Sequence, residues 1–300
     1  MNKPLQFQRT RIAPTPSGFL HLGNVLSFSL TAALARSTGA RILLRIDDLD
    51  RDRVNKAYVQ DIFDTLNFLE IPWDEGPRNM QEYESQYSQL HRMDHYLQAL
   101  GQLKERNAVF ACACSRAQVA QAVKDGSYPG TCLSSGLSLD ARGIAWRLHT
   151  AGAGSLTVRT LNHQSIRAAL PSSMQSFIVR KKDGYPAYQL ASLVDDLYFK
   201  VDLIVRGEDL WPSTLGQLYL ASVLEAGAFA GSHFHHHVLL KEGEGMKLSK
   251  SAGALSVQHL RKQGRKAGDI YRMISGMLGR TIPATSWKDL ADIMDVPAGS

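Results

Sequence analysis

The chain has 300 residues, which suffices for one large α/β domain with an insertion or for two ordinary domains, and excludes a disulfide-stapled mini-protein. Its 44% hydrophobic and 21% charged residues are typical of a globular protein and exclude a disordered or fibrous one. The 34 basic and 28 acidic residues give a formal net charge of +6, which favours a polyanionic partner such as nucleic acid, with membrane surfaces and phosphorylated metabolites as alternatives. No stretch approaches the roughly 18 apolar residues of a membrane span.

The first eleven residues lack the basic, apolar and small-residue layout of a signal peptide, so we expect a chain that stays in the reducing cytoplasm. Structural disulfides are therefore not expected. The three cysteines, Cys112, Cys114 and Cys132, fall within one short segment, which favours a shared ligand over buried free thiols.

The first half of the chain begins with a strand pattern at residues 7–13, followed by the turn Pro14-Thr-Pro-Ser-Gly18. A broad apolar face predicts a helix over 24–37, and 41–46 is again a strand pattern. Strand, helix and strand in this order indicate the first βαβ unit of a parallel, doubly wound sheet. Further helices are predicted over 56–69 and 82–106.

The next stretch, 109–160, changes to short strand patterns between Gly- and Ser-rich turns, which indicates an inserted module. Helix and strand patterns then alternate as in the second half of the same sheet, at 188–197, 201–206 and 215–225. We therefore predict a Rossmann-type doubly wound parallel sheet with an inserted module and a short helical C-terminal appendage. The predicted boundaries are 1–108, 109–175, 176–254 and 255–300.

Two separated motifs carry the chemistry. The first, residues 14–24, has glycines that let the backbone approach a ligand, and His21 stands where a helix N-terminus offers an anion site. The second, Lys247-Leu-Ser-Lys-Ser251, places two lysines in a Gly-bounded loop suited to clamping phosphates. Either motif alone is compatible with a capped turn or an exposed basic loop, but the pair on an α/β chain indicates a nucleotide site.

These motifs resemble the HIGH and KMSKS signatures of class I aminoacyl-tRNA synthetases. The segments RIAPTPSGFLH from residue 11, LRIDDLD from residue 44 and IVRGED from residue 204 are similar to the glutamyl-tRNA synthetase branch. The resemblance implies an ATP-dependent ligase that forms an aminoacyl-adenylate, with Mg²⁺ accompanying ATP. It also implies that His21, Gly23 and Asn24 face the ATP phosphates, with Lys247 and Lys250 bearing on the transition state.

The same resemblance implies a site for L-glutamate. Arg11 and Arg206 would lie near the carboxylates, Tyr188 would line the pocket, and the backbone of Ile12, Ala13, Pro14 and Thr15 would close it. The family usually has glutamate where this chain has Asp47. The shorter side chain allows a shifted pose, a bridging water or a different amino acid, and the other interpretation of Asp47 is an acid at a helix start.

The cysteine pattern fills three corners of a Zn²⁺ tetrahedron, and the residues alone leave Tyr128, Asp125 and His149 as candidates for the fourth. The glutamyl-Q tRNA(Asp) synthetases, relatives that lack an anticodon domain, have a similar Cys-x-Cys and Tyr-x-x-x-Cys order with tyrosine as a ligand. That resemblance implies one structural zinc, bound by Cys112, Cys114, Tyr128 and Cys132, in an acceptor-binding-like module.

Only 49 residues follow Ser251, which argues against a complete discriminating synthetase with its large anticodon-binding region. The leading hypothesis is therefore activation of L-glutamate and its transfer to queuosine at the wobble position of tRNA(Asp), by a cytoplasmic and monomeric enzyme. The alternatives are a truncated glutamyl-tRNA synthetase that charges the tRNA 3′ end and a non-catalytic paralogue that binds tRNA or an amino acid.

Overall fold

The computed structural model describes residues 5–123, 127–240 and 256–294. It divides into two compact units, each described here by itself. Unit 1 comprises Met1–His91, Leu203–Glu208 and His235–Ser300, and unit 2 comprises Arg92–Asp202 and Asp209–Phe234. The four-part division expected from the sequence remains a prediction.

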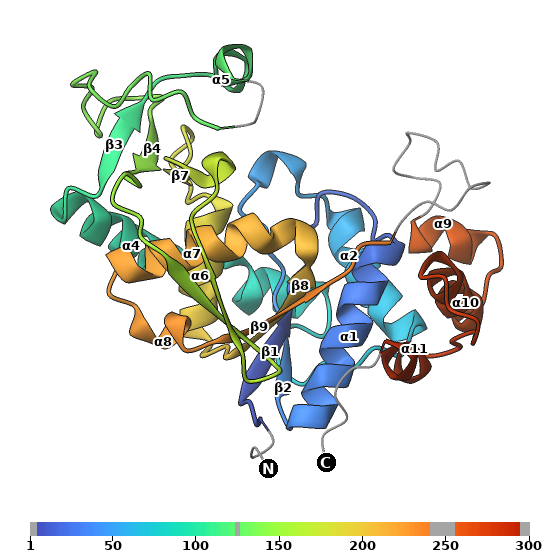
Figure 1. Ribbon diagram of the computed structural model, residues 1–300. Coiled ribbons are helices and arrows are strands. Elements are labelled where there is room, and N and C mark those ends of the chain that lie inside the picture. Colours follow the sequence, from blue (N-terminus) through green and yellow to red (C-terminus); the bar gives the residue numbers. More distant parts are fainter. Residues whose placement is uncertain (1–4, 124–126, 241–255, 295–300) are drawn as a thin grey trace. The chain divides into compact units, whose positions relative to one another are not determined.

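Unit 1 is built on a parallel pair of buried strands joined by a helix, as the sequence predicted. Strand β1 (Arg9–Ile12) pairs in parallel with β2 (Arg41–Leu44), and α1 (Leu22–Thr38) connects them. Figure 1 shows α1 running alongside both strands. The helix ends because Gly39 takes a left-handed φ of 75°, which suits a residue without a Cβ.

Two later strands extend this part of the molecule. Strand β8 (Leu203–Gly207) is buried throughout and lies alongside β1, and it neighbours β9 (His233–His237). The other helices of unit 1 are α2, the short α3, and the C-terminal α9, α10 and α11, of which α11 packs against α1. Their bounds are Lys56–Phe68, Met80–Glu82, Val257–Lys262, Ala267–Met277 and Trp287–Ile293.

The single helix predicted over 82–106 is wrong, because the chain breaks at Ser88. A π-helical turn η2 (Tyr83–Tyr87) and a 3₁₀ turn η3 (Gln89–Arg92) precede α4 (Met93–Glu105). The buried Asp48 carboxylate explains the break, since it accepts from Tyr83 Oη at 2.7 Å, Ser88 Oγ at 2.6 Å and the Gln89 N–H at 2.9 Å. Such long-range bonds outweigh a weak local helix preference.

Unit 2 combines helices with two antiparallel sheet regions. Strands β3, β4 and β7 form an antiparallel sheet, and β5 pairs antiparallel with β6 and parallel with the first residues of β9. Helix α6 packs against both α4 and α7. The strand bounds are Val109–Cys112, Ala145–Leu148, Leu156–Thr160, Ser165–Ala168 and Ile178–Arg180, for β3 to β7 in order. The helix bounds are Arg116–Ala122 for α5, Tyr188–Tyr198 for α6, Trp211–Val223 for α7 and Gly227–Ala230 for α8.

The two units thus give an α/β fold with parallel strand pairing, as predicted. Among the helices that the structure describes, none has the length and apolar character required to cross a membrane.

Candidate active site

The first motif forms the start of α1. His21 is the residue preceding the helix, and the Asn24 side chain accepts from the His21 N–H at 3.0 Å. A Cβ at Gly23 would lie 3.1 Å from the His21 ring, so glycine leaves room for the imidazole over the first turn. That turn contains no acidic side chain, and its N–H groups and dipole favour an anion. Burial lowers the pKa of His21, which keeps the ring neutral at pH 7.

Contacts that sequence reasoning missed hold this motif from two sides. The buried Asp61 on α2 accepts from the Leu20 N–H at 2.9 Å, one residue before His21. On the other side, the Val257 N–H donates to Leu20 O at 2.8 Å, and Ser256 forms an antiparallel bridge with His21. The chain that follows the second motif is therefore anchored to the first. Lys247 and Lys250 themselves lie outside the described residues.

The predicted glutamate residues of unit 1 come together around the end of β1. Arg11 and Arg206 are both nearly fully buried, at 5% and 3% exposure, on β1 and β8. Arg11 Nη1 donates to Val205 O at 3.2 Å, which places it one residue from Arg206 along β8. After β1, Ile12 O accepts from the Arg45 N–H and Pro14 O accepts from the Asp47 N–H, both at 2.9 Å.

The backbone from Ile12 to Thr15 therefore runs beside Asp47, but the Asp47 carboxylate already has a partner. Arg45 Nε lies 2.7 Å from Asp47 Oδ1 and Arg45 Nη2 lies 3.0 Å from Oδ2, with both residues buried. This two-point geometry is the strong form of an arginine–carboxylate pair. The only sequence signal for this pair is the short spacing of an arginine and an aspartate two residues apart.

Tyr188, the remaining predicted glutamate residue, belongs to unit 2. It is the first residue of α6, and its side chain is 42% exposed. The structure thus brings together the residues of unit 1, while the assignment of Tyr188 to the same pocket remains a prediction.

The histidines of β9 are a further feature of unit 1. Burial lowers the pKa of His235 to about 4 and that of His236 to about 3, with the positive charge of Arg206 as a second cause for His236. Both rings are therefore neutral at pH 7, and they offer polar atoms without adding charge to the region of Arg206.

The three cysteines of unit 2 converge as the sequence predicted, with their sulfur atoms within 4.8 Å of one another. Cys114 Sγ and Cys132 Sγ are 3.5 Å apart, and Tyr128 Oη lies 3.5 Å from Cys112 Sγ. Zn–S bonds of about 2.3 Å in a tetrahedron require sulfurs about 3.8 Å apart, and a shorter Zn–O bond brings an oxygen slightly closer. The three sulfurs therefore form a cluster that could hold a metal ion, with Tyr128 Oη beside Cys112 Sγ.

Nearby groups tune this cluster. Arg147 Nε lies 3.3 Å from Cys112 Sγ, and the Arg147 guanidinium lies 3.8 Å from the centre of the Tyr128 ring. This positive charge favours the thiolate form of the cysteines. Although burial opposes ionisation of Cys132, hydrogen bonds from Tyr128 and its neighbours lower the pKa of this thiol to about 7. Burial and the adjacent thiols raise the pKa of Tyr128, so a bound cation would have to offset that shift to ionise the tyrosine.

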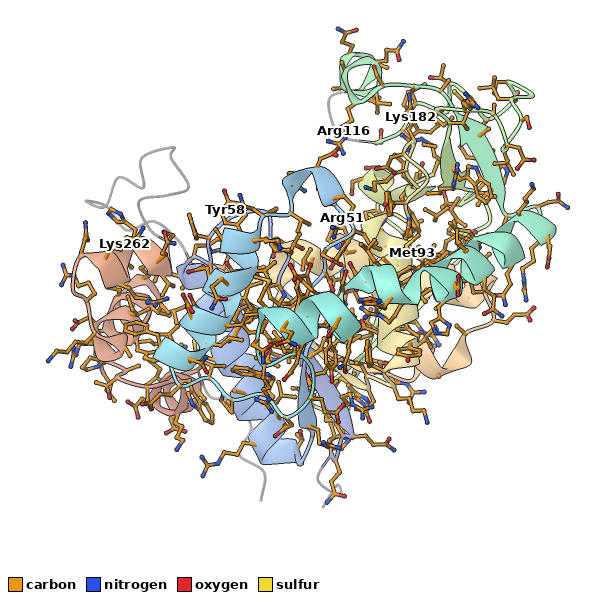
Figure 2. The ribbon with its side chains drawn as sticks, turned by 180° about the vertical axis from the view of Figure 1, so that it is seen from behind. Arg51, Tyr58, Met93, Arg116, Lys182 and Lys262 are labelled. Atoms are coloured by element: carbon orange, nitrogen blue, oxygen red, sulfur yellow. The ribbon has the colours of Figure 1, made fainter. Side chains whose placement is uncertain are left out.

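Of the other two candidates for the fourth ligand, His149 lies outside the cluster. The His149 ring is tilted against the Phe110 ring, with 4.9 Å between the ring centres, and among the described residues it is not part of the group of cysteines that could hold a metal ion. Asp125 lies outside the described residues. The same part of unit 2 carries the cations Arg116 and Lys182, and the latter donates to Ala113 O at 2.6 Å (Figure 2).

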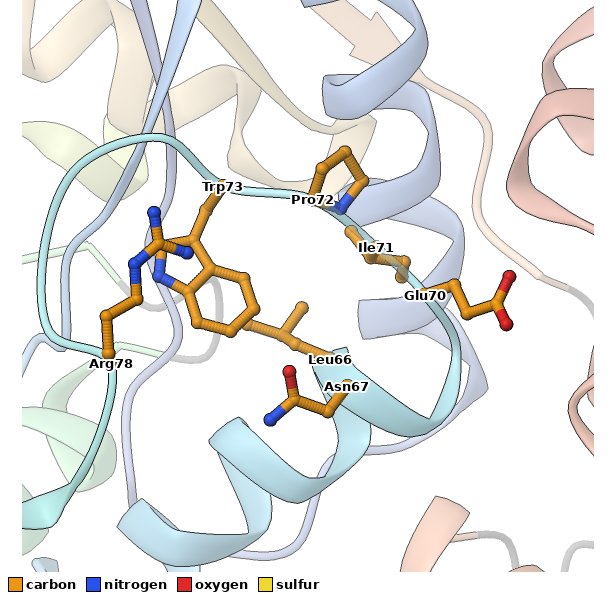
Figure 3. Close-up of a pocket in the computed structure, with 7 residues that line it drawn as sticks. All are labelled: Leu66, Asn67, Glu70, Ile71, Pro72, Trp73 and Arg78. Carbon is orange, nitrogen blue, oxygen red and sulfur yellow. The ribbon is translucent and has the colours of Figure 1, made fainter.

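A hollow of about 490 Å³ in unit 1 lies apart from these residues in the sequence. It is bordered by the end of α2 and the segment after it, where the Arg78 guanidinium lies 4.7 Å from the centre of the Trp73 ring (Figure 3). None of the predicted site residues lines it.

Comparison with known proteins defines the class. Residues 8–286 match the family described as tRNA synthetases class I (E and Q), catalytic domain. The chain therefore belongs to this family and is a class I aminoacyl-tRNA-synthetase-like ligase. Over 292 residues it is 35% identical to a glutamyl-Q tRNA(Asp) synthetase of Nitratidesulfovibrio vulgaris, with 92% of this chain and 88% of the relative covered. Within the class, the chain belongs to the glutamyl-Q tRNA(Asp) synthetase family.

Two further comparisons are with proteins that are longer than this chain. It is 31% identical to glutamate–tRNA ligase 2 of Acidithiobacillus ferrooxidans, covering 94% of this chain but 60% of that protein. The glutamate–tRNA synthetase structure from Elizabethkingia anophelis matches 99% of this chain and 66% of its own, with 20% identity and a TM-score of 0.74, and so supports the fold. The chain thus spans about two thirds or less of these longer proteins.

Proposed function

We propose that this protein activates L-glutamate with ATP and transfers the glutamyl group to queuosine at the wobble position of tRNA(Asp). The observation that carries the proposal is the match over 88% of a protein named glutamyl-Q tRNA(Asp) synthetase, combined with the motif geometry of unit 1. In the first step the glutamate α-carboxylate attacks the α-phosphorus of ATP, an acyl–phosphate bond forms, and pyrophosphate leaves. In the second step a hydroxyl of the nucleoside attacks the carbonyl carbon and AMP leaves.

The start of α1 would stabilise the charge of the first step. The residues assigned to the phosphates are His21, Gly23 and Asn24, because an N-terminal helix turn and a neutral imidazole donate hydrogen bonds without a proton transfer. Lys247 and Lys250 would supply the positive charge. The bridge between Ser256 and His21 supports a shared site, since Lys250 precedes Ser256 by six residues and an extended chain of that length spans about 20 Å.

Glutamate would bind beside the end of β1. Arg11 and Arg206 are assigned to its carboxylates, with Tyr188 lining the pocket and residues 12–15 closing it. Asp47 is assigned to the ammonium, because it supplies a negative charge beside the backbone of residues 12–15. The Arg45 pair also fixes the direction of this shorter carboxylate.

The cysteine cluster would hold one structural Zn²⁺ through Cys112, Cys114, Tyr128 and Cys132. When bound, the metal would cross-link β3 to the turn around Tyr128, in a segment that has few buried apolar residues of its own. Mg²⁺ would accompany ATP, and we expect the protein to act as a monomer.

The test is to incubate the protein with ATP, labelled glutamate and total tRNA, and then to cleave the RNA. The proposal predicts label in the anticodon stem-loop. Label on the 3′-terminal adenosine would favour the alternative of a compact charging enzyme, to which the similarity with glutamate–tRNA ligase 2 also points.

Activation is tested separately by glutamate-dependent exchange of pyrophosphate into ATP without tRNA. We expect exchange, and its absence would favour a non-catalytic paralogue. The Lys250→Ala variant should lower the exchange rate while leaving the melting temperature unchanged, whereas an unchanged rate would remove Lys250 from this role.

A further inference from the structure

One stretch of unit 2 has an unusual charge pattern. From residue 141 to residue 182 the chain contains seven arginine and lysine residues and no aspartate or glutamate. A chain with 28 acidic residues in 300 would place about four in such a stretch if they were evenly spread. The seven cations are Arg142, Arg147, Arg159, Arg167, Arg180, Lys181 and Lys182.

Several of these cations are engaged within unit 2. Arg147 contacts Cys112 of the cysteine cluster, the Arg180 guanidinium lies over the Trp146 ring, and Lys181 forms an ion pair with Asp183. By contrast, Arg159 and Arg167 are both exposed, and in the described part of the chain neither forms an ion pair with a carboxylate. These two residues lie on the hairpin formed by β5 and β6.

The register of the hairpin puts both arginines on one face. Arg159 is opposite Ser165, and Thr157 is opposite Arg167, so the two arginines are diagonal neighbours. Val158, between Thr157 and Arg159, is fully buried and points the other way. Diagonal neighbours of an antiparallel pair are about 7–8 Å apart, so two long arginine side chains can reach neighbouring groups on one extended polyanion.

The hairpin itself adds no negative charge to this face, because residues 155–168 include no aspartate or glutamate. On its inner side β5 pairs with β9 through His233 and Phe234, and Asp202 is the acidic residue whose charge acts on His233 there. On the outer side, β6 is the last strand of its sheet and is exposed along most of its length. This face carries two exposed guanidinium groups that form no ion pair within the described residues, beside the exposed residues Thr157 and Ser165. Such a face suits phosphate groups, to which arginine donates in fork geometry.

We propose that the outer face of the β5–β6 hairpin binds the sugar–phosphate backbone of the RNA substrate, through Arg159 and Arg167. The inference rests on the proposed function for the identity of the polyanion. It adds a docking surface to a reaction for which the described residues otherwise supply only the activation site and the cysteine module.

The test compares two double variants that lose the same charge. Arg159→Gln/Arg167→Gln removes the proposed contacts, whereas Arg36→Gln/Lys288→Gln removes two exposed cations of unit 1. Binding of unfractionated tRNA is measured by fluorescence anisotropy over roughly 50–200 mM salt. The hairpin variant should lower the magnitude of the slope of log K against log salt by about 2, one for each phosphate contact, and the control variant by clearly less.

A slope unchanged from the wild type would overturn the proposal. So would self-association of the hairpin variant with unchanged tRNA binding, because the arginines would then protect an open sheet edge against pairing. Glutamate-dependent pyrophosphate exchange without tRNA should stay at the wild-type rate in the hairpin variant. If exchange is absent in the wild type, the proposed function fails while the slope comparison still tests the hairpin.

Hydrogen exchange on the unmodified protein gives a second test that does not depend on a variant folding. Addition of unfractionated tRNA should slow exchange in peptides covering 155–168. Unchanged exchange there, at a tRNA concentration that saturates the anisotropy signal, would place the RNA elsewhere.

Discussion

Replacing Asp47 by asparagine tests the buried pair with Arg45. The two residues are 7% and 3% exposed, and two short hydrogen bonds join them. Asparagine keeps the shape but removes the charge, so the Arg45 guanidinium is left buried without its counter-charge. Breaking one side of such a pair costs about 3–5 kcal/mol, a large part of an ordinary folding free energy of about 5–15 kcal/mol.

Asp50→Asn is the matched control. Asp50 pairs with Arg53 three residues later, but their side chains are 35% and 64% exposed, so the loss should stay below about 1 kcal/mol. Urea unfolding followed by circular dichroism measures both. The reasoning fails if Asp47→Asn lowers the free energy of unfolding no more than Asp50→Asn does. In pyrophosphate exchange, Asp47→Asn should raise the KM for glutamate and leave that for ATP unchanged.

Three other changes have defined outcomes. Gly76→Ala should destabilise the protein far more than Gly39→Ala, because at φ 99° the new Cβ of residue 76 would lie 2.2 Å from a β2 carbonyl oxygen. Gly39, at φ 75°, has open space around it, so its replacement by alanine should lower the free energy of unfolding by only about 1–2 kcal/mol. Urea unfolding midpoints of the two variants test this difference. His235 and His236 have folded pKa values of about 4 and 3, below the usual 6.5, so the unfolded chain binds the extra protons. Stability should be full above about pH 6.5 and fall as pH drops toward 4, by up to about 1.4 kcal/mol per pH unit for each ring, and replacing both by glutamine should flatten urea midpoints between pH 7.5 and 5.5. Cys132→Ser should reduce bound zinc well below the wild-type content in metal analysis of reduced protein, and wild-type protein without zinc would contradict the site.

The sequence predicted those parts of the fold that local signals determine. The strand, turn and helix that begin the chain follow from an apolar run, a cluster of proline and glycine, and a broad apolar face, and the structure has β1, α1 and β2 in that order. The break at Ser88 could not be predicted in this way. It depends on Asp48, 40 residues earlier in the chain, whose carboxylate accepts from the Ser88 hydroxyl.

In the candidate site, too, the residues in local sequence patterns were predictable and the residues that act through distant contacts were not. The cysteines were predictable because metal ligands need particular residue types at short spacing, and their sulfurs do converge. Arg45 and Asp61 were missed because both act on other residues. Arg45 occupies the carboxylate of Asp47, and Asp61 receives the N–H of Leu20. Such positioning residues carry no motif of their own.

The contact between Ser256 and His21 shows that the chain after the second motif returns to the first motif, which the sequence spacing of the two motifs does not show. Two motifs more than 200 residues apart act together only if the fold returns the chain to its start, and no spacing rule fixes that return. The bridge between Ser256 and His21, together with the hydrogen bond from the Val257 N–H to Leu20 O, ties the chain that follows the lysine motif to the residues just before α1. A helix N-terminus attracts anions but supplies only partial charge, and a lysine loop supplies full charge without fixed direction. In the proposed adenylation step, the bridge at Ser256 would bring the two together, so that the phosphate site would have both orientation and charge.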